Sequence, residues 1–333
     1  MTTVSQDRAF YSELRLAQLR SELASLPELQ NTPKLTIFGA GSFARLEASQ
    51  YSDIDLFFLS DAAIGEDTKE RTNSYRVFGK ILQVANDLGF PDFSNDGEYL
   101  EILRASDILV NLGNRTDDHK NYFTARMLML LESRCLYGDA TFNRILSIII
   151  RSYFKDYPGH QENFQPTFLI NDISRYWKTI LLNYENKRPL ASLADGPDLE
   201  SKKTKNRVRN FKVKFSRLTT CYATVAAIGS FTSTVKEVDI IEMVKLTPRD
   251  RLIAACDRLP AIEPVVRRVL EKYESFQQYT GMSPEHLESH FSDTAKRTEM
   301  FSRANEYGDL MYSLIELIDK KVPKSRLLRT LVV

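Results

Sequence analysis

The chain is poor in cysteine and has no long apolar run. Its three cysteines, in 333 residues, are isolated and odd in number, which argues against a disulfide framework. The longest apolar candidate, around 225–228, is interrupted by Thr, Gly and Ser and is too short to cross a bilayer. The first residues lack the basic-then-apolar pattern of a secretory signal. We therefore expect a cytoplasmic protein without a membrane partner.

The chain also lacks an excess of either charge. Its formal net charge is +1, which by itself excludes no class of partner. Hydrophobic residues make up 43% and charged residues 27%, as in ordinary globular proteins. The length predicts two domains or one large domain.

The most informative stretch is 37–59. An apolar run ends in a small-residue loop at 39–42 (GAGS), and Asp53 and Asp55 stand at the head of a second apolar run. If both lie in a strand, their side chains point to the same side, with Ile54 facing the core. Two convergent carboxylates suit a hard cation such as Mg²⁺, and the backbone N–H groups of the loop suit phosphate oxygens.

This pattern resembles the nucleotidyltransferase fold shared with DNA polymerase β. It is closer to the catalytic domain of bacterial PII-protein uridylyltransferases and their relatives, which carry GGYGRxE followed by SDxDL. The matching runs here are 41–47 (GSFARLE) and 52–56 (SDIDL), and 123–139 resembles the helix that closes the active-site cleft in that group. The resemblance covers roughly 30–150. The phosphohydrolase and sensor domains of the full uridylyltransferases have no counterpart here, so a nitrogen-sensing role does not carry over.

The resemblance implies a two-metal nucleotidyltransferase that uses Mg²⁺ or Mn²⁺. Such an enzyme transfers NMP or dNMP from a nucleoside triphosphate, for example ATP, and releases pyrophosphate. Asp53 and Asp55 would hold the metal ions, and Gly41 and Ser42 would bind the β- and γ-phosphates.

A third carboxylate is expected from a third strand near 98–104. Glu101 ranks first as a catalytic and metal ligand because it stands between two apolar residues, Leu100 and Ile102. Asp96 ranks second and Glu98 is the remaining choice. Each of the three acids could equally face solvent.

Several arginines match the family pattern and have a structural alternative. Arg45 either contacts the nucleotide or forms a surface ion pair with Glu47. Arg126 and Arg134 lie close to one face of a predicted helix, where they reach the triphosphate or brace the domain.

A second informative stretch, 202–217, holds eight basic residues and no acid. A basic, partly helical face of this kind suits a triphosphate and a nucleic-acid or oligonucleotide acceptor, with Lys212 and Lys214 as nucleotide-binding candidates. These two lysines cannot both face a cleft from one helix, because two residues turn by about 200°. Phe211 and Phe215 share a face and are expected in the core.

Two further groups have open interpretations. The polar helix 171–187, which carries Trp177, either contacts base or ribose or holds a buried ion pair between helices. His286 and His290 have a spacing that can bind zinc, but no third ligand stands nearby.

The pattern as a whole predicts an α+β fold, with a small mixed-sheet domain followed by a larger all-helical domain. We expect an N-terminal helix in 1–30, a nucleotidyltransferase domain in 31–150 and a helical domain in 151–333, with the nucleotide in the cleft between the domains. Strands are expected at 34–39, 53–59 and 98–104 and a helix at 67–88. From about residue 104 onward helices are expected almost throughout, at 119–135, 140–155, 167–186, 205–228, 235–246, 260–278, 284–295 and 297–320.

Three functions compete at this point. The first is transfer to a nucleotide or oligonucleotide, which would suit an enzyme that makes a nucleotide signal in antiphage defence. The second is uridylylation or adenylylation of a protein acceptor. The third is a non-catalytic scaffold that keeps the fold.

Overall fold

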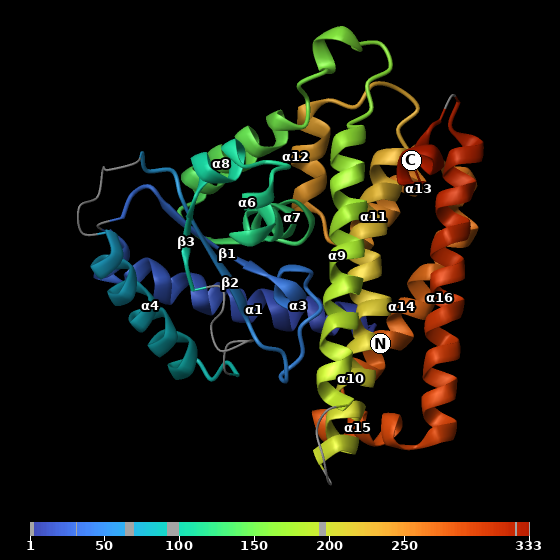
Figure 1. Cartoon of the computed structure of the whole chain (residues 1–333), viewed down its shortest axis with the longest axis horizontal. Coiled ribbons are helices and arrows are strands. Elements are labelled where there is room, and N and C mark those ends of the chain that lie inside the picture. Colours follow the sequence, from blue (N-terminus) through green and yellow to red (C-terminus); the bar gives the residue numbers. More distant parts are fainter. Residues whose placement is uncertain are drawn as a thin grey trace. The chain divides into compact units, whose positions relative to one another are not determined.

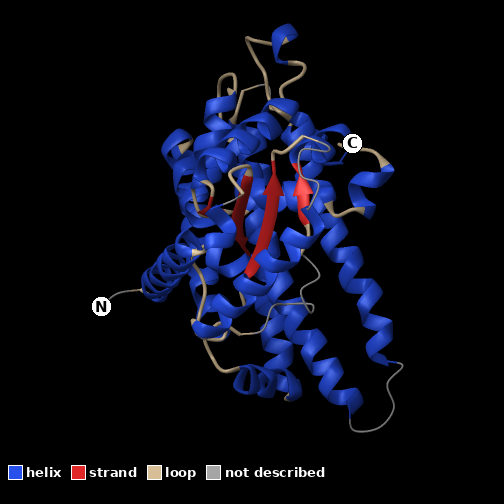
Figure 2. Ribbon diagram, turned by 90° about the vertical axis from the view of Figure 1, so that its left-hand side faces the viewer, coloured by secondary structure: helices blue, strands red, loops and turns tan. Residues whose placement is uncertain are grey.

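The computed structural model describes residues 3–30, 32–63, 70–91, 100–192, 198–323 and 325–332. Within these ranges helices dominate, and four short strands form one mixed sheet (Figures 1 and 2). This set of elements fits the predicted α+β class. The chain divides into two compact units, one formed by 1–156 with 237–247 and the other by 157–236 with 248–333.

The first unit carries the sheet. Its elements are α1 (Val4–Ser25), α2 (Pro27–Gln30), β1 (Leu35–Ala40), α3 (Gly41–Ala44), β2 (Asp55–Ser60), α4 (Glu70–Asp87), β3 (Ile102–Arg104), α5 (Ala105–Val110), α6 (Arg115–His119), α7 (Tyr122–Leu131), β4 (Arg134–Tyr137), α8 (Asp139–Ser152) and α12 (Glu237–Lys245). Residues 237–247, which the predicted ranges gave to the helical domain, cluster with this unit.

All the regular elements among the described residues of the second unit are helices. Its elements are η2 (Tyr157–Gly159), α9 (Thr167–Ser192), α10 (Asp198–Lys212), η3 (Val213–Arg217), α11 (Leu218–Gly229), α13 (Pro248–Arg258), η4 (Pro260–Ile262), α14 (Glu263–Thr280), α15 (Pro284–Ser292), α16 (Thr294–Lys321) and α17 (Leu327–Val332). None of the helices in the described ranges is long and apolar enough to cross a membrane.

The strand order is β3-β2-β1-β4. Strand β1 runs antiparallel to both β2 and β4, whereas β3 runs parallel to β2. Phe38 pairs with Phe57 and Ala40 pairs with Asp55 across β1 and β2. Because alternate residues of a strand face opposite sides, Asp55 shares its face of the sheet with Phe57.

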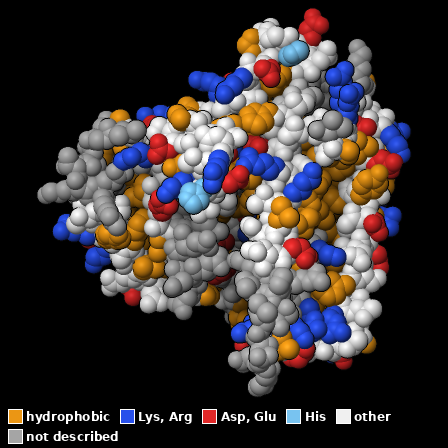
Figure 3. Space-filling model, viewed as in Figure 1, with side chains coloured by type: hydrophobic (Ala, Val, Ile, Leu, Met, Phe, Trp, Pro, Cys, Tyr) orange, Lys and Arg blue, Asp and Glu red, His pale blue; other side chains and the backbone are white. Residues whose placement is uncertain are grey.

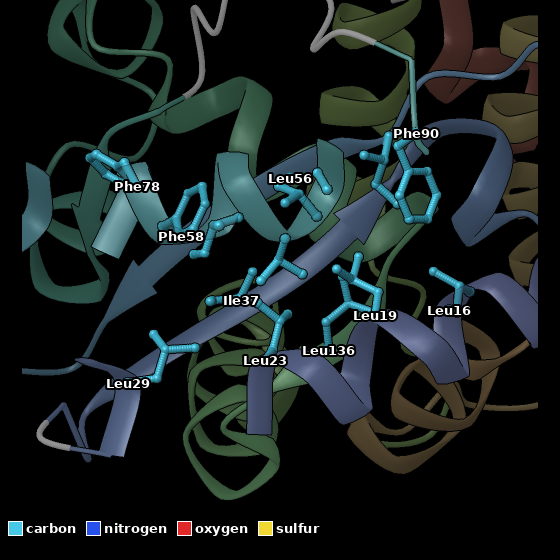
Figure 4. Close-up of a cluster of buried hydrophobic side chains, with 14 of the residues drawn as sticks. Leu16, Leu19, Leu23, Leu29, Ile37, Leu56, Phe58, Phe78, Phe90 and Leu136 are labelled. Carbon is cyan, nitrogen blue, oxygen red and sulfur yellow. The ribbon is translucent and has the colours of Figure 1, made fainter. Parts of the chain in front are cut away.

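Helices cover both faces of the sheet, which explains why β1 and β2 read as nearly continuous apolar runs. On one face, leucines from α1 pack with Ile37, Leu56 and Phe58 in a buried cluster (Figure 4). Each such side chain contributes about 2 kcal/mol when it is fully buried. On the other face, Phe142 of α8 makes an edge contact with Phe38, at a ring separation of 6.0 Å.

Strand β4 differs from the prediction, which continued a helix through 119–135. Helix α7 ends at Leu131, and Arg134–Tyr137 then pairs with β1. The turn that follows requires Gly138, whose φ is +75°, because a Cβ there would lie 2.3 Å from the carbonyl oxygen of Leu35.

An aromatic cluster fills part of the second unit. Phe215 stacks on Phe276 at 4.8 Å and on Tyr307 at 4.5 Å, and Phe211 joins the same cluster. Phe211 and Phe215 are both buried, so their expected place in the core is confirmed. The helix predicted at 205–228 is in fact α10 and α11 joined by η3, a single π-helical segment.

Candidate active site

The two predicted catalytic aspartates lie at the start of β2. Asp55 is its first residue, and Asp53 lies just before the strand; both are half-buried. A turn precedes them, because the amide of Ser52 donates to the carbonyl of Ser49 and the hydroxyl of Ser52 accepts from the amide of Ser49, at 2.9 and 3.0 Å. Since Asp53 precedes the strand, strand alternation does not by itself orient its side chain.

Gly41 is held against Asp55. A Cβ on Gly41 would lie 2.5 Å from Oδ2 of Asp55, closer than any ordinary contact, and the φ of Gly41 is +68°. Only glycine fits such a position without strain. The structure therefore brings the predicted phosphate-binding loop and one predicted metal ligand into contact.

The loop after Gly41 is short and tightly closed. It opens with a single helical turn, α3, and the amide of Glu47 donates to the carbonyl of Ser42 at 2.8 Å. The next residue, Ala48, donates its amide to the hydroxyl of Ser12 on α1 at 3.0 Å. Ser42 itself is half-buried.

Arg45 braces this loop from inside. Its guanidinium pairs with Glu47 at 2.8 Å and with Glu132, at the end of α7, at 2.5 Å, and all three side chains are buried. Arg8 of α1 also donates to the carbonyl of Glu47 at 2.9 Å. Arg45 thus pairs with Glu47, as the structural alternative expected, but the pair is buried and not at the surface. The nucleotide contact of Arg45 stays a prediction. Sequence reasoning missed Glu132 as its partner, although an acid that ends the apolar run of α7 was a usable signal.

The described residues do not assemble the predicted third ligand. Glu101 is exposed and precedes β3, whose first residue, Ile102, pairs with Phe58. Extending this register by one residue places Glu101 beside Phe57, which is two residues after Asp55 in β2. No group of three His, Cys, Asp or Glu side chains within the described ranges is arranged to hold a metal ion. Asp96 and Glu98 lie outside those ranges.

Glu101 instead contributes to the surroundings of Tyr122, the first residue of α7. Burial raises the pKa of Tyr122, and the negative charges of Asp107 and Glu101 raise it further, whereas Arg104 lowers it. Glu101 therefore lies within electrostatic reach of the start of α7.

Arg126 and Arg134 both act as braces. Arg126 is fully buried, makes two 2.8 Å contacts with the carboxylate of Asp117 and donates to the hydroxyl of Tyr153. Arg134 donates to the carbonyl of Ala44 at 3.1 Å and to that of Lys245, the last residue of α12, at 3.0 Å. Arg134 thus links the loop that follows β1 to α12.

The two candidate lysines lie in the helical unit. Lys212 is exposed at the end of α10. Lys214 lies in η3, donates to Oδ1 of Asn305 at 2.9 Å and stands over the ring of Phe301. Lys214 is therefore engaged within its own unit.

The remaining candidates make local contacts. Asp172 and Tyr176 of α9 are buried, and Asp172 pairs with Arg175 at 3.7 Å within the same helix. The ion pair between helices that the sequence suggested stays a prediction. On α15, Nδ1 of His290 lies 3.0 Å from the carbonyl of His286, one turn earlier.

Comparisons of the chain with protein families, with curated proteins and with solved structures found no match.

Proposed function

We propose that the protein is a metal-dependent nucleotidyltransferase. The reaction transfers a nucleoside monophosphate to a nucleotide or oligonucleotide acceptor and releases pyrophosphate. The observation that carries the proposal is the contact between Gly41 and the carboxylate of Asp55, which joins a small-residue loop to an acidic strand start. This juxtaposition is what phosphate binding beside a hard cation requires.

The donor set at the start of β2 fits Mg²⁺ or Mn²⁺, which prefer carboxylate oxygens. Asp53 and Asp55 would hold the ion, which when bound supplies charge neutralisation for a nucleoside triphosphate. The third carboxylate remains a prediction, with Glu101 first and Asp96 second.

The chain's own groups would position the substrate. Backbone N–H groups at Gly41 and Ser42 would donate to phosphate oxygens. Because Gly41 has no Cβ, its backbone can approach the phosphate closely. The buried pairs of Arg45 hold this loop in one geometry, which matters because catalysis of this type depends on positioning. Arg45 is thus proposed as a positioning residue.

The test is label transfer from each α-³²P NTP and dNTP with Mg²⁺ or Mn²⁺, resolved on a denaturing gel. The Asp53→Ala/Asp55→Ala variant is run beside the parent protein. A matched control removes two exposed carboxylates from helices of the same unit, Glu22→Ala/Asp87→Ala. We expect a labelled nucleotide product from the parent and the control, reduced by several orders of magnitude in the aspartate variant.

Three other outcomes would overturn this proposal. A single labelled protein band would indicate modification of a protein acceptor. No label with any nucleotide and acceptor, or equal label in the aspartate variant, would indicate that the fold does not carry this chemistry.

A further inference from the structure

One side of α10 carries a row of basic residues. Lys202, Lys205, Arg209 and Lys212 are spaced three, four and three residues apart, and all four are exposed. This spacing places them on one face of the helix, within about 80° of arc. We name this row the α10 ridge; it extends about 15 Å along the helix axis.

The other basic residues of α10 are separated from the ridge. Lys203 and Arg207 lie on a different flank, where they pair with Glu200 at 3.0 and 3.7 Å. Lys202, Lys205 and Arg209 form no ion pair with any residue that the structure describes. Of the two acids of α10, Glu200 is thus paired away from the ridge, whereas Asp198 is the first residue of the helix, one turn before Lys202.

The opposite side of α10 faces the core. Thr204 and Phe211 are buried there, and Phe211 joins the aromatic cluster. Packing of this side fixes the orientation of the helix, so the ridge faces solvent for structural reasons. By contrast, basic and acidic side chains are interspersed over much of the surface seen in Figure 3.

The ridge is suited to a linear polyanion. Its charges repeat along a line, whereas one triphosphate would need cations that converge on a point. The sequence 198–212 contains one aromatic residue, Phe211, which is buried, so the ridge offers no ring on which a base could stack. Contacts to phosphates alone carry no sequence information.

We infer that the α10 ridge binds the phosphodiester backbone of a nucleic-acid strand without base preference. Phosphate contacts made by Lys202, Lys205 and Arg209 release counterions, so binding weakens as salt rises. The inference deepens the proposed function, because such a strand is the acceptor that the transfer reaction would extend. Binding itself does not require catalysis.

The test is fluorescence anisotropy with fluorescein-labelled single-stranded RNA and DNA of mixed sequence, between about 50 and 200 mM salt. The ridge variant is Lys202→Gln/Lys205→Gln/Arg209→Gln. The matched control, Arg268→Gln/Lys320→Gln/Lys321→Gln, removes three exposed cations from other helices of the same unit. We expect the ridge variant to bind at least tenfold more weakly. The slope of log affinity against log salt should become shallower by about 2, at roughly 0.7 per lost phosphate contact.

Three results would overturn the inference. These are an absence of binding by the parent protein, an equal loss in the control variant, and competition by polyglutamate as strong as that by unlabelled oligonucleotide. The last would assign the ridge to acidic proteins. The Asp53→Ala/Asp55→Ala variant should bind the oligonucleotides as tightly as the parent protein. A loss of nucleotidyl transfer and a loss of nucleic-acid binding can therefore be distinguished.

Discussion

Replacing Gly41 with alanine tests the contact on which the proposed site depends. The new Cβ would lie 2.5 Å from Oδ2 of Asp55, so the carboxylate or the loop must move by about 1 Å to reach an ordinary contact. The backbone φ of +68° adds about 1–2 kcal/mol of strain for a residue with a side chain. A misplacement of about 1 Å among reacting groups costs on the order of 100-fold in rate.

The assay combines thermal unfolding with pyrophosphate release. Gly89→Ala is the matched control, because its φ is +71° and nothing lies within 4 Å of a Cβ built there. Both variants should lose about 1–2 kcal/mol through backbone strain. Gly41→Ala should lose more stability than the control, and it alone should lose about two orders of magnitude in rate.

A double variant separates the backbone strain at residue 41 from the steric clash of the new Cβ with Asp55. In Gly41→Ala/Asp55→Ala the carboxylate is gone, so stability should recover to the level of Gly89→Ala. If Gly41→Ala unfolds like Gly89→Ala and keeps the parent rate, the loop and Asp55 do not form one unit, and the reasoning fails.

Two other predictions concern buried groups. Arg126→Met leaves the carboxylate of Asp117 buried without its partner, so it should lower the free energy of unfolding, measured in urea, by about 3–5 kcal/mol. The double variant Arg126→Met/Asp117→Leu should recover most of that loss, because no buried charge is left unpaired. A double variant as unstable as Arg126→Met would contradict this account. Burial raises the pKa of Cys221 to about 12. The folded state therefore holds the thiol proton more tightly than the unfolded state, and this contribution is complete below about pH 8.5 and lost as pH rises toward 12. The free energy of unfolding should fall above about pH 9 by up to roughly 1.4 kcal/mol per pH unit, and less steeply in Cys221→Ala; equal slopes would refute the argument.

Local patterns in the sequence predicted many elements well. Helix α1, with buried Leu16, Leu19 and Leu23, follows from apolar spacing, and β1 and β2 follow from apolar runs. The burial of Phe211 and Phe215 followed from their separation of one helical turn.

The elements that the sequence did not predict depend on distant partners. Strand β4 has four residues, and its pairing with β1 joins segments about 100 residues apart, so no local period reveals it. Helix α13 was not among the predicted helix ranges, although helices were expected almost throughout from about residue 104, because its apolar run is short and flanked by charges. In the same way, the position of Glu132 at the end of an apolar run marks it as a candidate, but it does not identify Arg45, which lies on another element, as its partner.

The course of the chain through the two units has a practical consequence. The chain crosses from one unit to the other three times, near residues 156, 236 and 247. Helix α12, with buried Ile240, Met243 and Val244, packs against α7 and α8 and accepts a hydrogen bond from Arg134 through Lys245. A fragment cut near residue 150 would expose the apolar surface that α12 covers. An isolated first unit would therefore need α12 joined to α8 by a new linker that replaces 157–236.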